Sequence, residues 1–144
     1  MRLSAKVEYS LKALMALADV YLSKKKMSLL EISSQKNISS SFLLQLMIRM
    51  KSANIISSMR GSSGGYFLRR PPEDISVKDI IIAVDHTVLD RNMGDRPCVG
   101  EMDKVLVDFW DRFNDGIVDY LEGTSLHDLM QKSSSVKSSF VYSI

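Results

Sequence analysis

Few side chains in this sequence have the types and spacing that catalysis or metal binding requires. The chain of 144 residues contains one cysteine, Cys98, and two histidines, His86 and His127. A single cysteine excludes an internal disulfide and a metal site made only of cysteines from one chain. The glycines at 61–65 do not match a nucleotide-binding motif in spacing, and the sequence has neither a nucleophile elbow nor a paired-histidine motif. We therefore expect no enzymatic activity and no metal site.

A set of polar side chains has the chemistry of a DNA-contacting surface instead. They lie on a helix that we expect to begin after Ser39, at positions that its apolar stripe leaves free: Ser39, Ser40, Ser41, Gln45, Arg49 and Lys51. Residues near the start of such a helix can reach base edges in the major groove. Gln45 can bind adenine through two hydrogen bonds, and Arg49 and Lys51 suit contacts with the phosphate backbone. Arg60 suits a narrow minor groove, although plain solvent exposure is the alternative for each of these side chains.

The two halves of the chain differ strongly in charge, although the whole carries only +2. Residues 1–72 contain 12 Lys or Arg and 3 Asp or Glu, a net charge of +9, whereas residues 73–144 contain 7 and 14, a net charge of −7. A basic half that neutralises phosphates releases counterions, which favours association with nucleic acid. A solvated basic surface without such a role is the alternative.

The elements that must position these residues follow from the spacing of apolar side chains. Apolar residues recur every three or four positions over 7–22, which predicts an amphipathic helix. Ser28 and Glu31 form a Ser-x-x-Glu capping box before a short helix over 29–35, and Ser39 caps the next helix. Two short helices joined by a tight connection form a helix-turn-helix.

A β-hairpin is predicted directly after this helix-turn-helix. Residues 55–60 and 66–68 are the expected strands, and the glycines of 61–65 form the turn because they allow positive φ and a close approach to a phosphate. Ser76 then begins another amphipathic helix. Residues 1–85 are thus expected to form a winged helix-turn-helix with a two-stranded wing. With the long C-terminal helix that follows, the expected fold class is mainly α (α+β).

The remaining chain is predicted in three parts. Residues 86–100 show no sustained period and are expected to form a sensor loop that holds a ligand, with a mobile loop as the alternative. Residues 101–132 form helices, the first with more apolar surface than one small domain covers, so we expect dimerisation; packing on its own domain is the alternative. The expected interface residues are Met102, Val105, Phe109, Trp110, Phe113 and Ile117. Thr124 or Ser125 caps the last helix, and the Ser-rich residues 133–144 are expected to be a flexible tail.

Several motifs resemble those of one family of bacterial regulators. The matching stretches are Met1-Arg2-Leu3-Ser4 with Tyr9 and Ala13-Leu14, then Ile38-Ser39-x-Ser41-Phe42-Leu43-x-Gln45-Leu46, then Ser58-x-Arg60-Gly61-x-x-Gly64-Gly65-Tyr66, and Pro72-Glu73-Asp74-Ile75 with 80–85. Trp110 and Thr124-x-Leu126-x-Asp128-Leu129 extend the similarity. The chain resembles the Rrf-two family of winged helix-turn-helix transcription regulators, the family of IscR, NsrR and CymR.

The resemblance implies a homodimer that is crossed by the long helix and binds double-stranded operator DNA. Ser39, Ser41, Gln45 and Arg60 fall on positions that contact operator DNA in the family. The full set of expected DNA-binding residues is Arg2, Ser39, Ser40, Ser41, Gln45, Arg49, Lys51, Arg60, Gly61, Gly64, Gly65 and Tyr66. Leu44 departs from the pattern, because some members carry there an acidic residue that selects among DNA sites.

Some members of the family bind an iron-sulfur cluster, and this chain has few of the residues that hold it in them. Cluster-binding members carry three cysteines in the loop and the start of the long helix, whereas only Cys98 occupies such a position here, with Asn92 and Lys104 near the other two. Glu8 matches an acidic position that supplies a ligand in some members. Two ligands fall short of the four that clusters usually need. We expect no cofactor, with a cluster held by Cys98 and Glu8 as the alternative.

The function expected is that of a sequence-specific DNA-binding transcriptional regulator, a repressor without a three-cysteine cluster site. Its signal would be a partner protein, a small metabolite or oxidation of Cys98. The positive charge of Arg96 would favour the thiolate of Cys98, which is the form that is oxidised. The alternatives are a cluster sensor with unusual ligands and a winged-helix module for protein interaction. No stretch is long and apolar enough to cross a membrane, so we expect a cytoplasmic protein.

Overall fold

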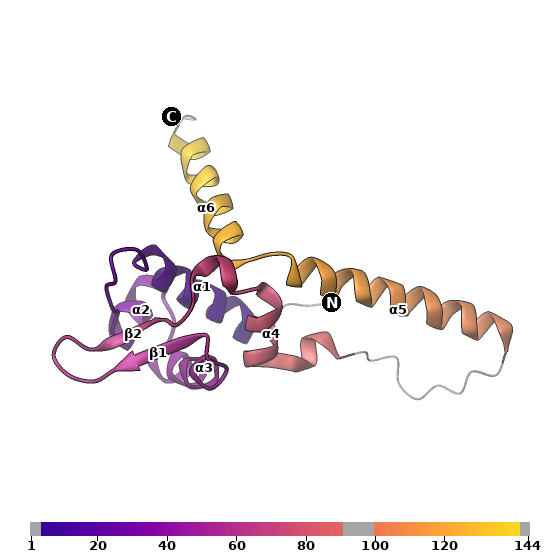
Figure 1. The fold of residues 1–144 in the computed structure, drawn as a ribbon, viewed down its shortest axis with the longest axis horizontal. Helices are drawn as coiled ribbons and strands as arrows, with labels where there is room; N and C mark the ends of the chain where they lie inside the picture. Colours follow the sequence, from indigo (N-terminus) through magenta and orange to yellow (C-terminus); the bar gives the residue numbers. More distant parts are fainter. Residues whose placement is uncertain (1–3, 91–99, 142–144) are drawn as a thin grey trace.

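The computed structural model describes residues 4–90 and 100–141, so Arg2 and Cys98 lie outside the described residues. In chain order, the elements are α1 (Ala5–Asp19), α2 (Leu29–Lys36), α3 (Ser40–Ser52), β1 (Ile56–Met59), β2 (Gly65–Leu68), η1 (Pro72–Asp74), α4 (Val77–Asp85), η2 (His86–Leu89), α5 (Glu101–Glu122) and α6 (Leu126–Val141). Figure 1 shows α1 to α4 gathered with the two strands in one body, from which α5 and α6 extend. The fold is mainly helical with a two-stranded antiparallel sheet and a long C-terminal helix, which confirms the predicted fold class.

Serine side chains cap the helices of the N-terminal region, as the sequence predicted for α2 and α3. The Ser28 N–H donates to Glu31 Oε2 at 2.6 Å, and the Glu31 N–H donates to Ser28 Oγ at 3.2 Å, which completes the predicted capping box. Both bonds satisfy donors that have no partner inside the helix. The first helix is shorter than predicted: α1 ends at Asp19, and Leu22 is 92% exposed instead of belonging to the apolar stripe. The chain turns after Val20, so the helical period no longer decides which side chains are buried.

The hairpin of β1 and β2 confirms the predicted wing. Its register pairs Met59 with Gly65 next to the turn. The loop before α2 adds a further pair at the edge, because Met27 and Tyr66 exchange backbone hydrogen bonds of 3.0 and 2.8 Å. Gly65 has a φ of +138°, and a Cβ there would lie 2.8 Å from the Met27 carbonyl oxygen. Position 65 therefore requires glycine for both its backbone conformation and its close contact.

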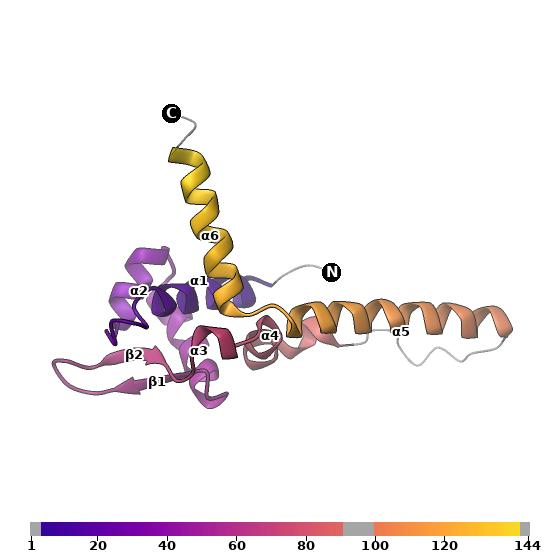
Figure 2. The same ribbon diagram turned by 45° about the horizontal axis from the view of Figure 1, so that its top comes forward.

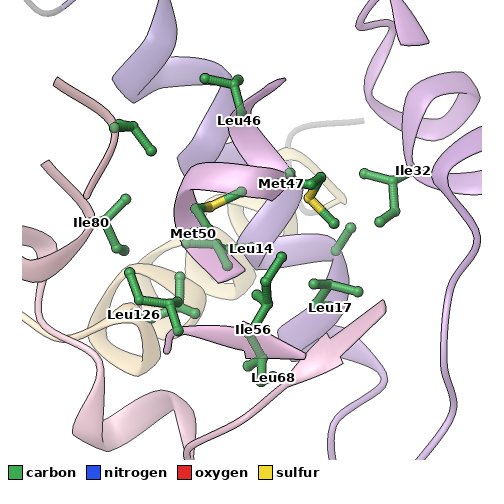
Figure 3. Packing of buried hydrophobic residues seen from close by; sticks show 14 of the residues in the cluster. Leu14, Leu17, Ile32, Leu46, Met47, Met50, Ile56, Leu68, Ile80 and Leu126 are labelled. Carbon is green, nitrogen blue, oxygen red and sulfur yellow. The ribbon is translucent and has the colours of Figure 1, made fainter. Parts of the chain in front are cut away.

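One cluster of buried apolar side chains joins α1 to α4, the wing and the start of α6 (Figure 3). The labelled members, from five helices and both strands, are Leu14, Leu17, Ile32, Leu46, Met47, Met50, Ile56, Leu68, Ile80 and Leu126. Burying one such side chain stabilises the folded chain by about 1.5–3 kcal/mol. This shared core fixes α3 and the wing relative to each other.

The long helix α5 differs from the elements around this core, because none of its residues is buried. It extends away from the winged region and is joined to it at its C-terminal end (Figures 1 and 2). At that end the Val77 N–H donates to the Thr124 carbonyl and the Leu126 N–H donates to the Ile75 carbonyl, each at 2.8 Å. The end of α5 is therefore fixed to the winged region, while the rest of its length projects outward.

The helix α6 begins with a reciprocal cap at Ser125 rather than at Thr124. The Ser125 N–H donates to Asp128 Oδ2 at 2.8 Å, and the Asp128 N–H donates to Ser125 Oγ at 3.1 Å. The hydrogen bond from the Ser125 N–H is the main cause that holds the pKa of Asp128 below its usual value. The sequence left Thr124 and Ser125 as alternatives, and the structure selects Ser125.

The flexible tail predicted over 133–144 is corrected as far as Val141, because α6 continues to that residue; residues 142–144 lie outside the described residues. Serine hydroxyls in this stretch donate to carbonyls three or four residues earlier, as Ser138 Oγ does to the Ser134 carbonyl at 3.1 Å. A serine-rich stretch can satisfy its polar groups within a helix in this way, although serine is a weak helix former. The serine-rich composition of the segment predicted disorder, whereas the structure shows a helix in which the serine hydroxyls are bonded locally.

The start of the loop predicted over 86–100 is the short 3-10 helix η2, which follows α4 without a break; residues 91–99 lie outside the described residues. Among the helices that the structure describes, none is both long and apolar enough to cross a lipid bilayer.

Candidate nucleic-acid interface

The helix α3 has one buried face and one exposed face. Its buried residues are Leu43, Leu46, Met47 and Met50, which belong to the shared core. Exposed residues recur three or four positions apart along the other side: Ser41, Leu44, Gln45, Ile48 and Ser52. The core on one side of α3 therefore holds the opposite side outward, where it can meet a ligand as large as a DNA groove.

The three serines predicted as DNA contacts at the start of α3 have different surroundings. Ser39 is the N-cap, and its Oγ accepts a hydrogen bond from the Phe42 N–H at 3.4 Å. Ser40 Oγ lies 3.0 Å from Ser33 Oγ of α2 and so links the two helices of the helix-turn-helix. Ser41 is exposed on the outer face of α3. Ser39 and Ser40 therefore stabilise the fold, by capping α3 and by bonding to α2, whereas Ser41 lies at the surface.

The two basic residues of α3 are both bonded to neighbouring elements. Arg49 Nη1 donates to the Val84 carbonyl at 3.2 Å, near the end of α4. Lys51 Nζ donates to Ser58 Oγ on β1 at 2.6 Å. These bonds connect α3 to α4 and to the wing. Both cations still add positive charge beside the outer face of α3, which favours a polyanion.

The predicted wing residues lie together at one end of the hairpin. Arg60 and Gly61 are exposed at the turn, and the Gly64 N–H donates to the Gly61 carbonyl at 3.0 Å to close it. Tyr66 is half-buried behind the turn, where its backbone binds Met27. The hairpin therefore offers one exposed guanidinium at its tip and a backbone without bulky side chains around it.

Two exposed apolar residues lie beside Gln45 on the outer face of α3. Leu44 is 41% exposed and Ile48 is 58% exposed. Aliphatic side chains on a helix in the major groove can contact the C5-methyl group of thymine. In the sequence, the motif marks Leu44 only as a departure from its pattern and gives no sign of Ile48. Their four-residue spacing outside the buried stripe was the signal that would have found them.

The residues predicted for dimerisation form an apolar stripe along α5. All six lie at the surface or are half-buried: Met102, Val105, Phe109, Trp110, Phe113 and Ile117. The Trp110 ring lies edge to face against Phe109 and Phe113, with centroid distances of 5.3 and 5.6 Å. These aromatic side chains stabilise one another but leave much apolar area in water.

The residues of this chain do not fit an iron-sulfur cluster. Over 4–90 and 100–141, no group of three or more His, Cys, Asp or Glu side chains is placed to hold a metal ion. The Glu8 carboxylate accepts a hydrogen bond from Lys12 Nζ at 2.6 Å, and this bond raises the pKa of Lys12. Cys98 is the one thiol of the chain and lies outside the described residues. One thiol and one carboxylate already paired with an amine do not match clusters that are held by four thiolates.

Comparisons with known proteins point to the same kind of molecule. The family model described as "Rrf2: Iron-dependent Transcriptional regulator" matches residues 3–132. The HTH-type transcriptional regulator IscR of Photorhabdus laumondii is 33% identical over 131 residues, which cover 90% of this chain and 79% of the relative. The structure of CymR, the global cysteine regulator of B. subtilis, has a TM-score of 0.78 at 27% identity and covers 92% of this chain and 98% of that chain. CymR of Staphylococcus aureus has a TM-score of 0.70 at 31% identity, with 88% and 96% covered.

These matches extend over the winged region and α5 alike, so they are not limited to a shared helix-turn-helix. They confirm the resemblance that the motifs around Gln45 and Arg60 indicated, and with it a transcriptional regulator of the IscR and CymR type. Because the family model spans most of the chain and a relative with 33% identity covers 90% of it, this chain belongs to the Rrf2 family of DNA-binding transcriptional regulators.

Proposed function

We propose that this protein binds operator DNA sequence-specifically as a homodimer and represses transcription without a three-cysteine iron-sulfur site. The observation that carries the proposal is the outer face of α3, which combines hydrogen-bonding and apolar side chains on a helix fixed by the core on its other side. This face belongs to residues 1–72, the half of the chain with 12 basic and 3 acidic residues. Positive charge and a rigid exposed helix are the two features that DNA recognition requires.

Base recognition is assigned to the exposed residues in the first turns of α3. Gln45 can donate to N7 and accept from N6 of adenine, and Ser41 is close enough in the helix to contact the same or a neighbouring base pair. Leu44 and Ile48 would contact thymine methyl groups on either side. Arg60 at the tip of the wing would enter the adjacent minor groove, where A-T-rich sequences attract arginine.

Dimerisation is assigned to the apolar stripe of α5. A helix with no buried residue but with Phe109, Trp110 and Phe113 in water exposes more apolar surface than a soluble monomer usually does. A two-fold axis would bring the stripe of a second copy against it and bury both. The two α3 helices of the dimer would then read the two halves of a palindromic site.

The experiment is selection of duplexes from a random DNA library with the purified protein, followed by fluorescence anisotropy on the selected site. We expect the logarithm of the affinity to fall linearly with the logarithm of salt concentration, because counterions are released on binding. Gln45→Ala should cost about 1–3 kcal/mol and relax the preference at one base pair. In a promoter reporter that carries the selected site, the protein should lower expression.

The matched control is Gln131→Ala, which removes an exposed glutamine from α6, away from α3. It should leave both the affinity and the base preference unchanged. If no duplex is enriched and no salt-dependent affinity is found, the winged region is a protein-interaction module and the proposal is wrong. An equal loss with Gln131→Ala and Gln45→Ala would contradict the assignment of base recognition to α3.

The homodimer is tested separately by sedimentation velocity. The wild-type chain should sediment as a dimer, and the double variant Phe109→Ser with Phe113→Ser should sediment as a monomer with an unchanged circular dichroism spectrum. A wild-type monomer at high protein concentration would contradict the dimer. A dimer that survives the double substitution would place the interface outside the aromatic part of α5.

A further inference from the structure

A pocket of about 350 Å³ lies between the end of α1, the lysine loop (residues 24–26) and the wing. Its lining contains Leu17 from α1 and Leu68 from β2, which are 1% and 4% exposed, and therefore a floor that is continuous with the core. Tyr21 and Phe67, both half-buried, add aromatic walls. Ligand pockets commonly have about 300–1,000 Å³ and mostly apolar walls. This pocket has the composition of a small-molecule site and lies at the lower end of that range in size.

Three consecutive lysines, Lys24, Lys25 and Lys26, also line the pocket. Among the ion pairs that the described residues form, none involves these amines. Lys25 is near enough to Glu31 to lower the pKa of that carboxyl slightly, but the Glu31 carboxylate is already held by the Ser28 N–H at 2.6 Å. Within residues 4–90 and 100–141, no carboxylate forms an ion pair with any of these three cations.

The backbone of the lysine loop is held in an unusual conformation. Lys24 has a φ of +55°, in the left-handed region that residues other than glycine, asparagine and aspartate rarely adopt. Such a conformation costs about 1–3 kcal/mol and persists where the surrounding structure enforces it, which is common at ligand sites. The Lys24 N–H donates to the Tyr21 carbonyl at 3.0 Å, so the turn that brings the lysines to the pocket is fixed at its start.

We propose that this pocket binds a small amphipathic carboxylate, with its acyl or aryl part against Leu17, Tyr21, Phe67 and Leu68 and its carboxylate among the three lysines. Apolar walls alone would accept any small hydrophobic molecule. The lysines select an anion, and the small volume selects one short tail instead of a phospholipid. Met59 of β1, which is 51% exposed, lies at the mouth and is free to adapt to the tail.

The position of the pocket connects its occupant to the wing. The lysine loop continues into Met27, which is bonded to Tyr66 of β2 through both backbone groups. Met59 and Phe67 belong to the two strands of the wing itself. A bound carboxylate would neutralise positive charge beside the wing and would thereby lower the affinity for DNA. This second step rests on the proposed function, whereas binding of the carboxylate does not.

The first experiment is isothermal titration calorimetry of the full chain without DNA, with decanoate as the probe. Decanol, which has the same tail without charge, and acetate, which has the charge without a tail, are the matched controls. Decanoate should bind at least about tenfold more tightly than either control. Equal affinity for decanol would remove the role of the lysines, and equal affinity for acetate would remove the role of the pocket; either result overturns the proposal.

The site is located with two double variants of equal charge. Lys24→Gln with Lys25→Gln should weaken decanoate binding about tenfold or more, while Lys132→Gln with Lys137→Gln on α6 should leave it unchanged. Thermal unfolding by circular dichroism checks that both variants fold. Met59→Glu, which puts a carboxylate at the mouth, should also exclude decanoate. Unchanged binding to the variant without Lys24 and Lys25 would overturn the proposal even if the protein binds decanoate elsewhere.

The effect on DNA is measured last, with the duplex selected for the wild-type chain. Decanoate should lower the DNA affinity of the wild-type protein and of the α6 variant, each compared with its own ligand-free value. It should have no effect on the variant that lacks Lys24 and Lys25. If decanoate binds as expected and the affinity for DNA stays constant, the coupling to the wing is wrong and the ligand site stands.

Discussion

The helices α3 and α5 both carry a regular apolar stripe, and the structure uses the two stripes in opposite ways. In α3 the stripe of Leu43, Leu46, Met47 and Met50 is buried in the chain's own core. In α5 no residue is buried, although its aromatic residues follow the same helical period. The polar side of α3 and the apolar side of α5 are therefore the two exposed faces to which we assign DNA binding and dimerisation.

The difference arises from where each helix is attached. On its apolar side α3 is covered by α1, α2, α4 and β1, whose side chains join its own in the core (Figure 3). α5 meets the winged region at its C-terminal end, where Lys78 Nζ lies 2.9 Å from Glu122 Oε2 and the backbone around Thr124 is bonded to Val77. The spacing of apolar residues thus predicts which side of a helix is apolar. The place where the helix is attached decides whether other parts of the same chain can bury that side.

The largest effect should come from shortening a buried side chain of α3. Leu46 is 1% exposed, so Leu46→Ala leaves a cavity and should lower the free energy of unfolding by about 2–5 kcal/mol. Urea unfolding followed by far-UV circular dichroism measures it. Leu44→Ala makes the same change on the exposed side of the same helix and should cost less than about 0.5 kcal/mol. Similar losses for the two variants would mean that α3 is not buried on the side described.

A smaller effect, of a different kind, should follow from shortening an aromatic side chain of α5. In the proposed dimer, Trp110→Ala removes apolar area that the second copy covers, so about 1.5–3 kcal/mol should be lost from association instead of from folding of one chain. The midpoint of wild-type unfolding should therefore rise with protein concentration, and that rise should weaken in Trp110→Ala. The loss caused by Leu46→Ala should be present at every concentration. A wild-type unfolding midpoint that is independent of protein concentration would contradict the proposal that a second copy covers α5.

A pair of glycine substitutions compares the two regions at the level of the backbone. Gly65→Ala combines a φ of +138° with a Cβ 2.8 Å from the Met27 carbonyl oxygen, and should cost about 1–3 kcal/mol of unfolding free energy. At Gly116 of α5 a Cβ meets nothing within 4 Å, so Gly116→Ala should stabilise the helix by about 0.5–1 kcal/mol. Thermal unfolding at low protein concentration measures both. A neutral Gly65→Ala would show that the wing can move away from the lysine loop.

Much of the winged region could be predicted because its signals are local. The capping box of Ser28 and Glu31, the cap at Ser39 and the glycines of the turn each act within a few residues. Local signals did not predict two other features, the end of α1 and a bond between distant segments. Nothing near Leu22 in the sequence tells that the helix stops before it, and the bond from Arg49 to Val84 joins residues that are far apart in the chain.

The sequence predicted which residue types form the candidate interface better than it predicted which of their side chains face solvent. Gln45 and Ser41 lie on the exposed face as expected, because helical period alone places them. Ser40 was expected at the surface, yet its hydroxyl bonds to Ser33 of α2. Sequence spacing cannot distinguish a serine that joins two helices from one that faces solvent. The pocket beside the wing was missed for the same reason, since its lining comes from three separate segments.

The smallest effect should appear in the pH dependence of stability and should belong to the winged region. The Ser28 N–H holds the pKa of Glu31 below its ordinary value of 4.5. Because the pKa is lower in the folded state, the carboxylate stabilises the fold above the unfolded-state value, and this contribution is lost as the pH falls through the folded-state value. Glu31→Gln keeps the capping bond but cannot titrate, so urea midpoints measured from neutral to acid pH should fall less steeply than in the wild type. Ser28→Ala keeps the backbone N–H that binds the Glu31 carboxylate and removes only the hydroxyl. It should therefore flatten the acid limb less than Glu31→Gln does, while lowering stability at neutral pH by about 1 kcal/mol. An unchanged acid limb in both variants would mean that the loss of stability in acid arises from other carboxylates, such as Asp128 at the start of α6.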